Sequence, residues 1–141
     1  PAYVEAAAQL KTELTAPGQV QSVVLTRTSF GSTPMPEGED LKTFAKTGAT
    51  LVIHLSIRRL NYIYRELTPI LGDDALVAVL YRIGWPDQQI ILDRLDNIAS
   101  KVREKKITRT ALIITGKNFK KKSDMNSVLY DENFNHLFRP K

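Results

Sequence analysis

The sequence predicts an α/β fold: a layered domain with a mixed, mostly parallel five-stranded sheet flanked by helices. Short β-branched or apolar runs alternate along the 141 residues with segments of helical periodicity, which is typical of a layered α/β domain. Only the turn 83–87 separates the third predicted strand from the fourth. These two strands must pair antiparallel, because a parallel crossover needs about a dozen residues, and the sheet is therefore mixed.

The first predicted element is a helix that starts without a capping residue. The chain opens at Pro1, and residues 3–10 already follow a helical pattern. Because no Ser, Thr, Asp or Asn precedes this helix to accept from its free N–H groups, we expect a fragment whose upstream part is absent.

A strand, a long loop and a short helix follow. Residues 20–26 are rich in Val and come after a Pro-Gly turn signal, so they predict a strand. Residues 28–38 contain two glycines and two prolines and predict a loop, and loops of this length in a compact domain are often functional. Residues 39–46 predict a short helix that Gly48 ends.

The middle of the chain continues the alternation. Residues 50–55 are a continuous apolar run, which predicts a strand covered on both faces. Ser56 is placed to cap the next helix, in which apolar residues recur at helical spacing until Pro69 and Gly72 end it.

The last elements are two strands, a helix and a fifth strand. Residues 75–81 and 88–93 predict the two strands on either side of the short turn. The helix that follows places Leu95, Ile98, Ala99 and Val102 on its inner face, and 111–116 predicts the fifth strand.

Composition excludes several classes of protein. Cysteine is absent, which excludes disulfides, thiolate nucleophiles, Cys-ligated zinc and iron–sulfur clusters. The two histidines, His54 and His136, are too few and too far apart in sequence to suggest a metal site. The sequence has no Gly-x-Gly-x-x-Gly or Walker-type loop. No apolar run approaches the roughly 20 residues that span a bilayer and no secretory signal is present, so we expect a cytoplasmic protein without membrane contact.

The net charge of +5 points to an anionic partner. Much of the excess lies in the basic loop 117–124, where Phe119 stands among lysines. A single aromatic residue is a thin signal for nucleic-acid binding, and a solvated loop is the simpler interpretation.

Ligands of open sheets gather at strand ends, where this sequence places several arginines. Arg27, Arg58, Arg59 and Arg82 could hold carboxylates through their forked donors, although ordinary surface ion pairs explain each one alone. Two nearby residues each allow two interpretations. His54 is a core histidine or faces a ligand, and Trp85 is a packed loop anchor or a platform for a planar ligand.

Several blocks of the sequence resemble, in order, segments of the tetrapyrrole methylase family. They contain a Pro-x-Pro-Glu motif, a Tyr-Arg…Trp-Pro-Asp motif and a Tyr-Asp…His-x-Phe-Arg motif, and they cover nearly the whole chain. The blocks are residues 25–27, 34–39, 48–53, 79–88 and 107–116 and, near the C-terminus, 129–131 with 134–139.

The resemblance implies a two-domain methyltransferase that holds S-adenosyl-L-methionine between its domains. Residues 1–16 would be the linker helix from a missing N-terminal domain, and residues 17–141 the C-terminal domain, with a tail at 125–141. The tail narrows the implied reaction to methylation of C11 of precorrin-4 or cobalt-precorrin-4 in cobalamin biosynthesis. The chain alone is expected to be inactive.

The resemblance also implies the site residues. Cofactor contacts fall on Ala2, Tyr3, Leu55, Tyr81, Arg82, Thr110, Ala111 and Leu112. Substrate contacts fall on Arg27, Pro34, Glu37, Arg82 and Trp85, while Phe30-Gly31-Ser32 stands where the family usually shows Gly-Arg. Methyl transfer from a sulfonium to an electron-rich ring carbon needs no protein nucleophile, so no catalytic residue and no metal are expected, and catalysis is largely positioning.

The implied partners are the tetrapyrrole substrate, the missing N-terminal domain and a second copy of the enzyme in a homodimer. Two alternatives stay open at this point. One is a small basic nucleic-acid-binding module, and the other is a different tetrapyrrole C-methyltransferase of the same family.

Overall fold

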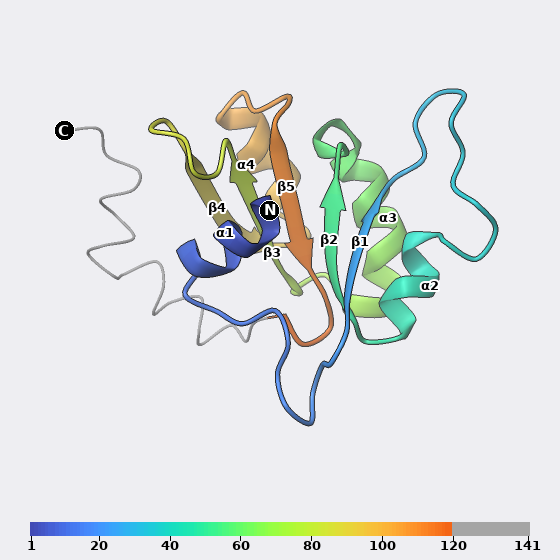
Figure 1. Ribbon diagram of the computed structural model, residues 1–141. Helices are drawn as coiled ribbons and strands as arrows, with labels where there is room; N and C mark the ends of the chain where they lie inside the picture. Colours follow the sequence, from blue (N-terminus) through green and yellow to red (C-terminus); the bar gives the residue numbers. More distant parts are fainter. Residues whose placement is uncertain (120–141) are drawn as a thin grey trace.

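The computed structural model describes residues 1–119, which form one sheet with helices on both faces (Figure 1). The elements in chain order are α1 (Ala2–Gln9), β1 (Val23–Arg27), α2 (Leu41–Lys46), β2 (Thr50–His54), η1 (Ile57–Arg59), α3 (Leu60–Leu71), β3 (Leu76–Tyr81), β4 (Gln89–Arg94), α4 (Ile98–Glu104) and β5 (Ala111–Thr115). None of the helices within this range is long and apolar enough to cross a membrane.

The five strands lie in the order β1-β2-β5-β3-β4. The β1 and β2 strands pair parallel, whereas β5 runs antiparallel to both β2 and β3, and β3 pairs antiparallel with β4. The predicted mixed five-stranded sheet with flanking helices is confirmed. The prediction that the sheet is mostly parallel is wrong, because only the β1–β2 pairing is parallel. The last strand inserts in the middle of the sheet in the opposite direction, and the sequence shows no local signal for that long-range choice.

The sheet has an apolar core on each face. On one face α2, α3 and α4 cover a core that includes Leu41, Ile63 and Ile98 (Figure 1). On the other face α1 covers a smaller core through Ala6 and Leu10, together with buried side chains of β2, β3, β4 and β5. Strands buried on both sides explain the continuous apolar runs of the sequence.

Two end signals of the helices differ from the prediction. Ser56 makes no capping hydrogen bond, and its hydroxyl is used elsewhere in the fold. Pro69 lies inside α3, which continues to the Gly72 cap at φ +88°. Pro69 has no N–H to donate to the carbonyl of Arg65, an exposed residue, while the buried face of α3 keeps its contacts.

The helix at the start of the chain is shorter than the predicted 1–16. It covers Ala2–Gln9, has no side-chain cap, and is followed by an irregular segment. The side chain of Asp40, in contrast, caps α2 by accepting from the backbone N–H of Thr43 at 3.1 Å.

Candidate functional site

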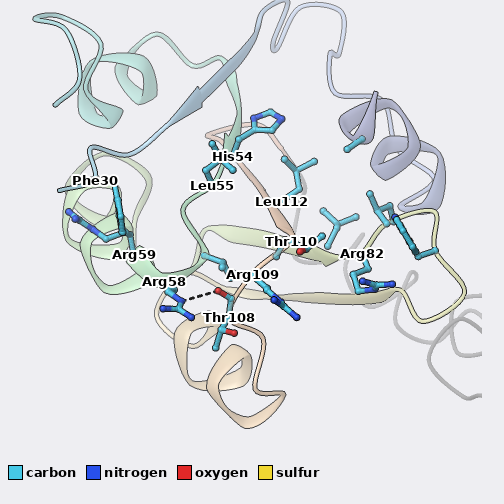
Figure 2. Close-up of a pocket in the computed structure, with 16 residues that line it drawn as sticks. Phe30, His54, Leu55, Arg58, Arg59, Arg82, Thr108, Arg109, Thr110 and Leu112 are labelled. Atoms are coloured by element: carbon cyan, nitrogen blue, oxygen red, sulfur yellow. Dashed lines mark hydrogen bonds between the residues drawn. The ribbon is translucent and has the colours of Figure 1, made fainter. Parts of the chain in front are cut away.

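A pocket of about 570 Å³ lies at one edge of the sheet (Figure 2). Because β5 is antiparallel to its neighbours, its first residues lie beside the last residues of β2 and β3. The pocket is lined by residues from these three ends, by η1 and by the turn after β3. Its volume is in the range of small-molecule sites.

The backbone at this edge adopts an unusual conformation at three positions. Leu55, Arg82 and Thr110 have φ of 55°, 48° and 54°, the left-handed region that residues other than glycine rarely occupy. All three line the pocket, and the N–H of Arg82 donates to the carbonyl of Thr110 at 3.0 Å. Such strain concentrates at functional sites, so these residues mark the pocket as a candidate site.

The pocket also gathers exposed apolar side chains. Leu55 is 86% exposed, Phe30 62% and Trp85 57%, and all three line the pocket. Large apolar groups left open to solvent around a concavity mark a surface that binds a ligand or another protein surface.

The charged lining of the pocket is entirely basic. Its charged side chains are Arg58, Arg59, Arg82 and Arg109, and no Asp or Glu of residues 1–119 is among the lining. Figure 2 shows these guanidinium groups spread around the rim. The lining therefore suits an anionic ligand.

Arg82 is held by two contacts inside the turn that follows β3. Its Nε donates to Oδ1 of Asp87 at 2.8 Å, and its guanidinium lies 4.4 Å from the ring centroid of Trp85. The hydrogen bond raises the pKa of Arg82 and lowers the pKa of Asp87. Trp85 is thus an exposed ring stacked with a cation, and the interpretation of Trp85 as a packed anchor is wrong.

A buried hydroxyl connects the end of β2 to the loop after β1. Oγ of Ser56 accepts from the backbone N–H and the Oγ1 of Thr28 at 2.9 and 3.0 Å, and donates to the carbonyl of His54 at 2.7 Å. Ser56 and Thr28 are both buried. This network fixes the backbone on either side of Leu55. His54 is half-buried and lines the pocket, so its interpretation as a core histidine is wrong.

The structure brings most of the residues predicted for the cofactor together. The pocket is lined by six of the eight, namely Ala2, Leu55, Arg82, Thr110, Ala111 and Leu112. The other two, Tyr3 and Tyr81, are not among its lining residues. Tyr3 packs against the core under α1, and Tyr81 packs against the core on the opposite face of the sheet.

The predicted substrate residues divide differently. Arg82 and Trp85 line the pocket, whereas Arg27, Pro34 and Glu37 do not. The Arg27 guanidinium turns back to its own loop, where Nη1 donates to the carbonyls of Thr28 and Thr33 at 2.9 and 3.3 Å.

Phe30 and Arg109 are two of the lining residues that had not been predicted. Phe30 reaches the pocket from a narrow turn in which it exchanges hydrogen bonds with Thr33. Arg109 precedes β5 and therefore lies near the amino end of a strand. A rule that considers only the carboxyl ends of strands does not select it. An antiparallel strand brings its amino end to the ligand edge, which is the signal that could have identified Arg109.

The basic loop is described only at its start. Phe119 is buried in the core that α1 covers, so its ring is not available for stacking on a base. Lys117 is exposed. Lys120, Lys121, Lys122 and the tail 125–141 lie outside the described residues.

Fold and site together define an α/β domain with a ligand-sized pocket whose rim is basic. A family model described as Tetrapyrrole (Corrin/Porphyrin) Methylases matches residues 1–99. The chain belongs to this family.

Curated relatives extend the match along the chain. The chain is 43% identical over 139 residues to a precorrin-4 C(11)-methyltransferase of Sinorhizobium sp, covering 99% of this chain and 55% of the relative. It is 42% identical over 137 residues to a cobalt-precorrin-4 C(11)-methyltransferase of Methanocaldococcus jannaschii, covering 95% of this chain and 52% of the relative. The chain thus spans about half the length of the curated relatives it matches.

Solved structures share the fold. A cobalt precorrin-4 methyltransferase of cobalamin biosynthesis superposes with a TM-score of 0.77 at 32% identity, covering 84% of this chain and 49% of that one. A uroporphyrin-III C-methyltransferase from Thermus thermophilus, solved with S-adenosyl homocysteine, superposes with a TM-score of 0.61 at 23% identity, covering 80% of this chain and 46% of that one.

Proposed function

We propose that this chain is part of an S-adenosyl-L-methionine-dependent methyltransferase that methylates C11 of precorrin-4 or cobalt-precorrin-4 in cobalamin biosynthesis. The observation that carries the proposal is the pocket, which gathers six of the eight residues assigned to the cofactor by resemblance. The names of the relatives that match over 92% or more of this chain support the choice of substrate.

The lining of the pocket fits such a cofactor. Leu55, Ala111 and Leu112 supply an apolar wall suited to a flat base. When bound, S-adenosyl-L-methionine supplies a methyl group on a sulfonium, which is already a good leaving group.

The role of the chain's own residues is then to position the two reactants. The strained backbone at Leu55, Arg82 and Thr110 belongs to three adjacent strand ends, and the Ser56 network holds one of them in place. Positioning two reactants in this way can lower the barrier by roughly 7–11 kcal/mol. The exposed Phe30 and Trp85 offer apolar faces to a flat macrocycle.

The proposal includes partners beyond this chain. We propose that the pocket is completed by a domain equivalent to the half of the relatives that this chain does not cover. The exposed apolar side chains around the pocket support such a cover. A homodimer, implied by the family resemblance, and a cytoplasmic location, expected from the sequence, complete the proposal.

Split-protein reconstitution tests this function. The chain is produced alone and together with the half of the Sinorhizobium relative that it does not cover, and each sample receives precorrin-4 and S-adenosyl-L-methionine with a labelled methyl group. We expect labelled product only when both halves are present. A matched sample with uroporphyrinogen III in place of precorrin-4 tests the alternative substrate, which a 31% match over 89 residues to a uroporphyrinogen-III C-methyltransferase suggests.

Two results would contradict the proposal. One is a reconstituted complex that binds S-adenosyl homocysteine yet labels neither uroporphyrinogen III nor precorrin-4 in its metal-free or cobalt form. The other is labelling of uroporphyrinogen III with none of precorrin-4, which would leave the family assignment intact and transfer the activity to another substrate.

A further inference from the structure

We propose that Arg58 and Arg109 form a carboxylate-binding subsite that holds the acid side chains of the tetrapyrrole, separate from the groups that hold the cofactor. The inference rests on the proposed function and assigns the recognition of the substrate to particular side chains. Arg58 comes from η1 and Arg109 from the residue before Thr110 at the start of β5.

The two side chains lie on the same side of the pocket. Nε of Arg58 donates to the carbonyl of Thr108 at 3.1 Å, which ties η1 to the chain immediately before Arg109. Figure 2 shows Arg58 beside Thr108 and the side chain of Arg109 extending along the same rim in the direction of Arg82. Both arginines line the pocket.

Hydrogen-bond donors of both Arg58 and Arg109 are available to bind a ligand. Nε of Arg58 is occupied, so its two Nη groups form the free end of the fork. Within residues 1–119 no carboxylate lies in ion-pair distance of Arg58 or Arg109, whereas Arg82 and Arg94 are paired with Asp87 and Asp96. Each guanidinium can bind one carboxylate through its forked donors, so a ligand with several carboxylates can engage both arginines.

Arg82 and Arg27 are poorer candidates for this role. Arg82 is already bound to Asp87 and stacked on Trp85, and Arg27 donates to two carbonyls of its own loop outside the pocket. A ligand would have to displace these contacts before either guanidinium could bind it. The pair Arg58 and Arg109 requires no such exchange.

A carboxylated macrocycle is a better occupant of the subsite than the cofactor. The residues assigned to the cofactor include the strand-end residues Leu55, Arg82 and Ala111, and neither Arg58 nor Arg109 is among them. A flat polyacid could cover the exposed ring of Phe30 while its acid arms reach the rim.

The test measures binding of a polycarboxylate porphyrin, uroporphyrin, to the 141-residue chain by fluorescence polarisation. R58Q and R109Q are each expected to weaken binding by about tenfold, because a charge-assisted bidentate contact is lost. R109K, which keeps the charge without the fork, is expected to recover part of the affinity. The matched control is R103Q, an exposed arginine of α4 outside the pocket, which removes the same charge.

A second readout separates substrate from cofactor. Binding of S-adenosyl homocysteine, followed through the fluorescence of Trp85, the single tryptophan of the chain, should be unchanged in R58Q and R109Q. Circular dichroism melting of each variant verifies that the fold persists.

Three outcomes overturn the inference: no uroporphyrin binding by the native chain, equal losses in R103Q and R109Q, or a loss of S-adenosyl homocysteine binding alone in the two variants. None of these decides the proposed function, because the reconstituted methyl-transfer assay measures that function with the native chain. If that assay fails while R58Q and R109Q weaken uroporphyrin binding as expected, the subsite stands and the proposed reaction falls.

Discussion

At the scale of single residues, the strand ends combine backbone strain with exposed side chains. Leu55 shows both, with φ of 55° and a side chain that is 86% exposed. A position of this kind contributes little to the core and holds an unfavourable conformation, so stability alone does not explain a leucine there. A ligand contact does explain it.

This interpretation predicts opposite effects of one substitution on stability and on binding. Leu55→Gly should raise the free energy of unfolding by about 1 kcal/mol, because glycine adopts the left-handed conformation without cost. It should also weaken binding of S-adenosyl homocysteine. Urea unfolding and a ligand titration on the same protein measure the two effects.

Leu25→Gly is the matched control. Leu25 is also an exposed leucine, at 52%, but it lies within β1 and has no positive φ. Its replacement should lower the free energy of unfolding by about 1 kcal/mol and leave ligand binding unchanged. If Leu55→Gly behaved like Leu25→Gly in both measurements, Leu55 would have no role in the pocket.

Residue types alone identified only part of the site. Arg82, Trp85 and Leu55 were assigned to the site by the family resemblance, and all three line the pocket. Arg27 ends a strand too, yet its guanidinium donates to carbonyls of its own loop. The direction of a long side chain depends on nearby acceptors that only the folded loop provides.

At the scale of elements, the placement of β5 determines the site. It lies between β2 and β3 and runs against both, which brings residues 109–112 to the edge where the other two strands end. The pattern of the sequence predicted each strand to within a few residues. The order of the strands depends on contacts between segments far apart in the chain, which no local pattern encodes.

The carboxyl end of β5 is a point of close approach. A Cβ added to Gly116 would lie 2.9 Å from the carbonyl oxygen of Ala49 and 3.1 Å from Cα of Thr50. Both are backbone atoms that cannot move without disturbing β2. We therefore expect Gly116→Ala to lower the free energy of unfolding by about 1–3 kcal/mol in urea unfolding.

Gly38→Ala provides the comparison. Gly38 also has a positive φ, of 83°, but no atom lies within 4 Å of an added Cβ. Its replacement should cost only the conformational preference, about 1 kcal/mol. Equal losses at the two positions would show that the crowding of Gly116 by Ala49 has no energetic effect.

An acidic residue joins β4 to α4 and predicts a dependence of stability on pH. Burial of Asp93 raises its pKa, but hydrogen bonds from Lys101, at 2.7 Å, and from the backbone N–H of Arg94 outweigh burial and lower its pKa below the ordinary 3.8. A carboxylate with a lowered pKa stabilises the fold above its unfolded pKa, and this stability is lost as the pH falls through the folded value.

We therefore expect Asp93→Asn to be less stable than the native chain at neutral pH. The difference between the two should shrink as the pH falls below 3.8, where Asp93 itself becomes protonated. Urea unfolding at a series of pH values measures this. A difference that stays constant across the series would exclude the ionised form of Asp93 as the source of the stability.

At the scale of the whole molecule, this family member spans about half the length of its curated relatives and has a pocket of about 570 Å³ at one edge of its sheet. Phe30, Leu55 and Trp85 remain exposed around that pocket. The second domain proposed above would bury them and exclude water from the pocket, so we expect ligand binding by this chain alone to be weaker than binding with that domain present.

The most direct test of the pocket as the cofactor site is chemical-shift mapping by NMR on the isotopically labelled chain, which detects weak binding. Addition of S-adenosyl homocysteine should move the amide signals of Leu55, Arg82 and residues 110–112, and leave those of α4 in place. Signals that stay unmoved at saturating ligand, or that move mainly away from this edge of the sheet, would contradict the account.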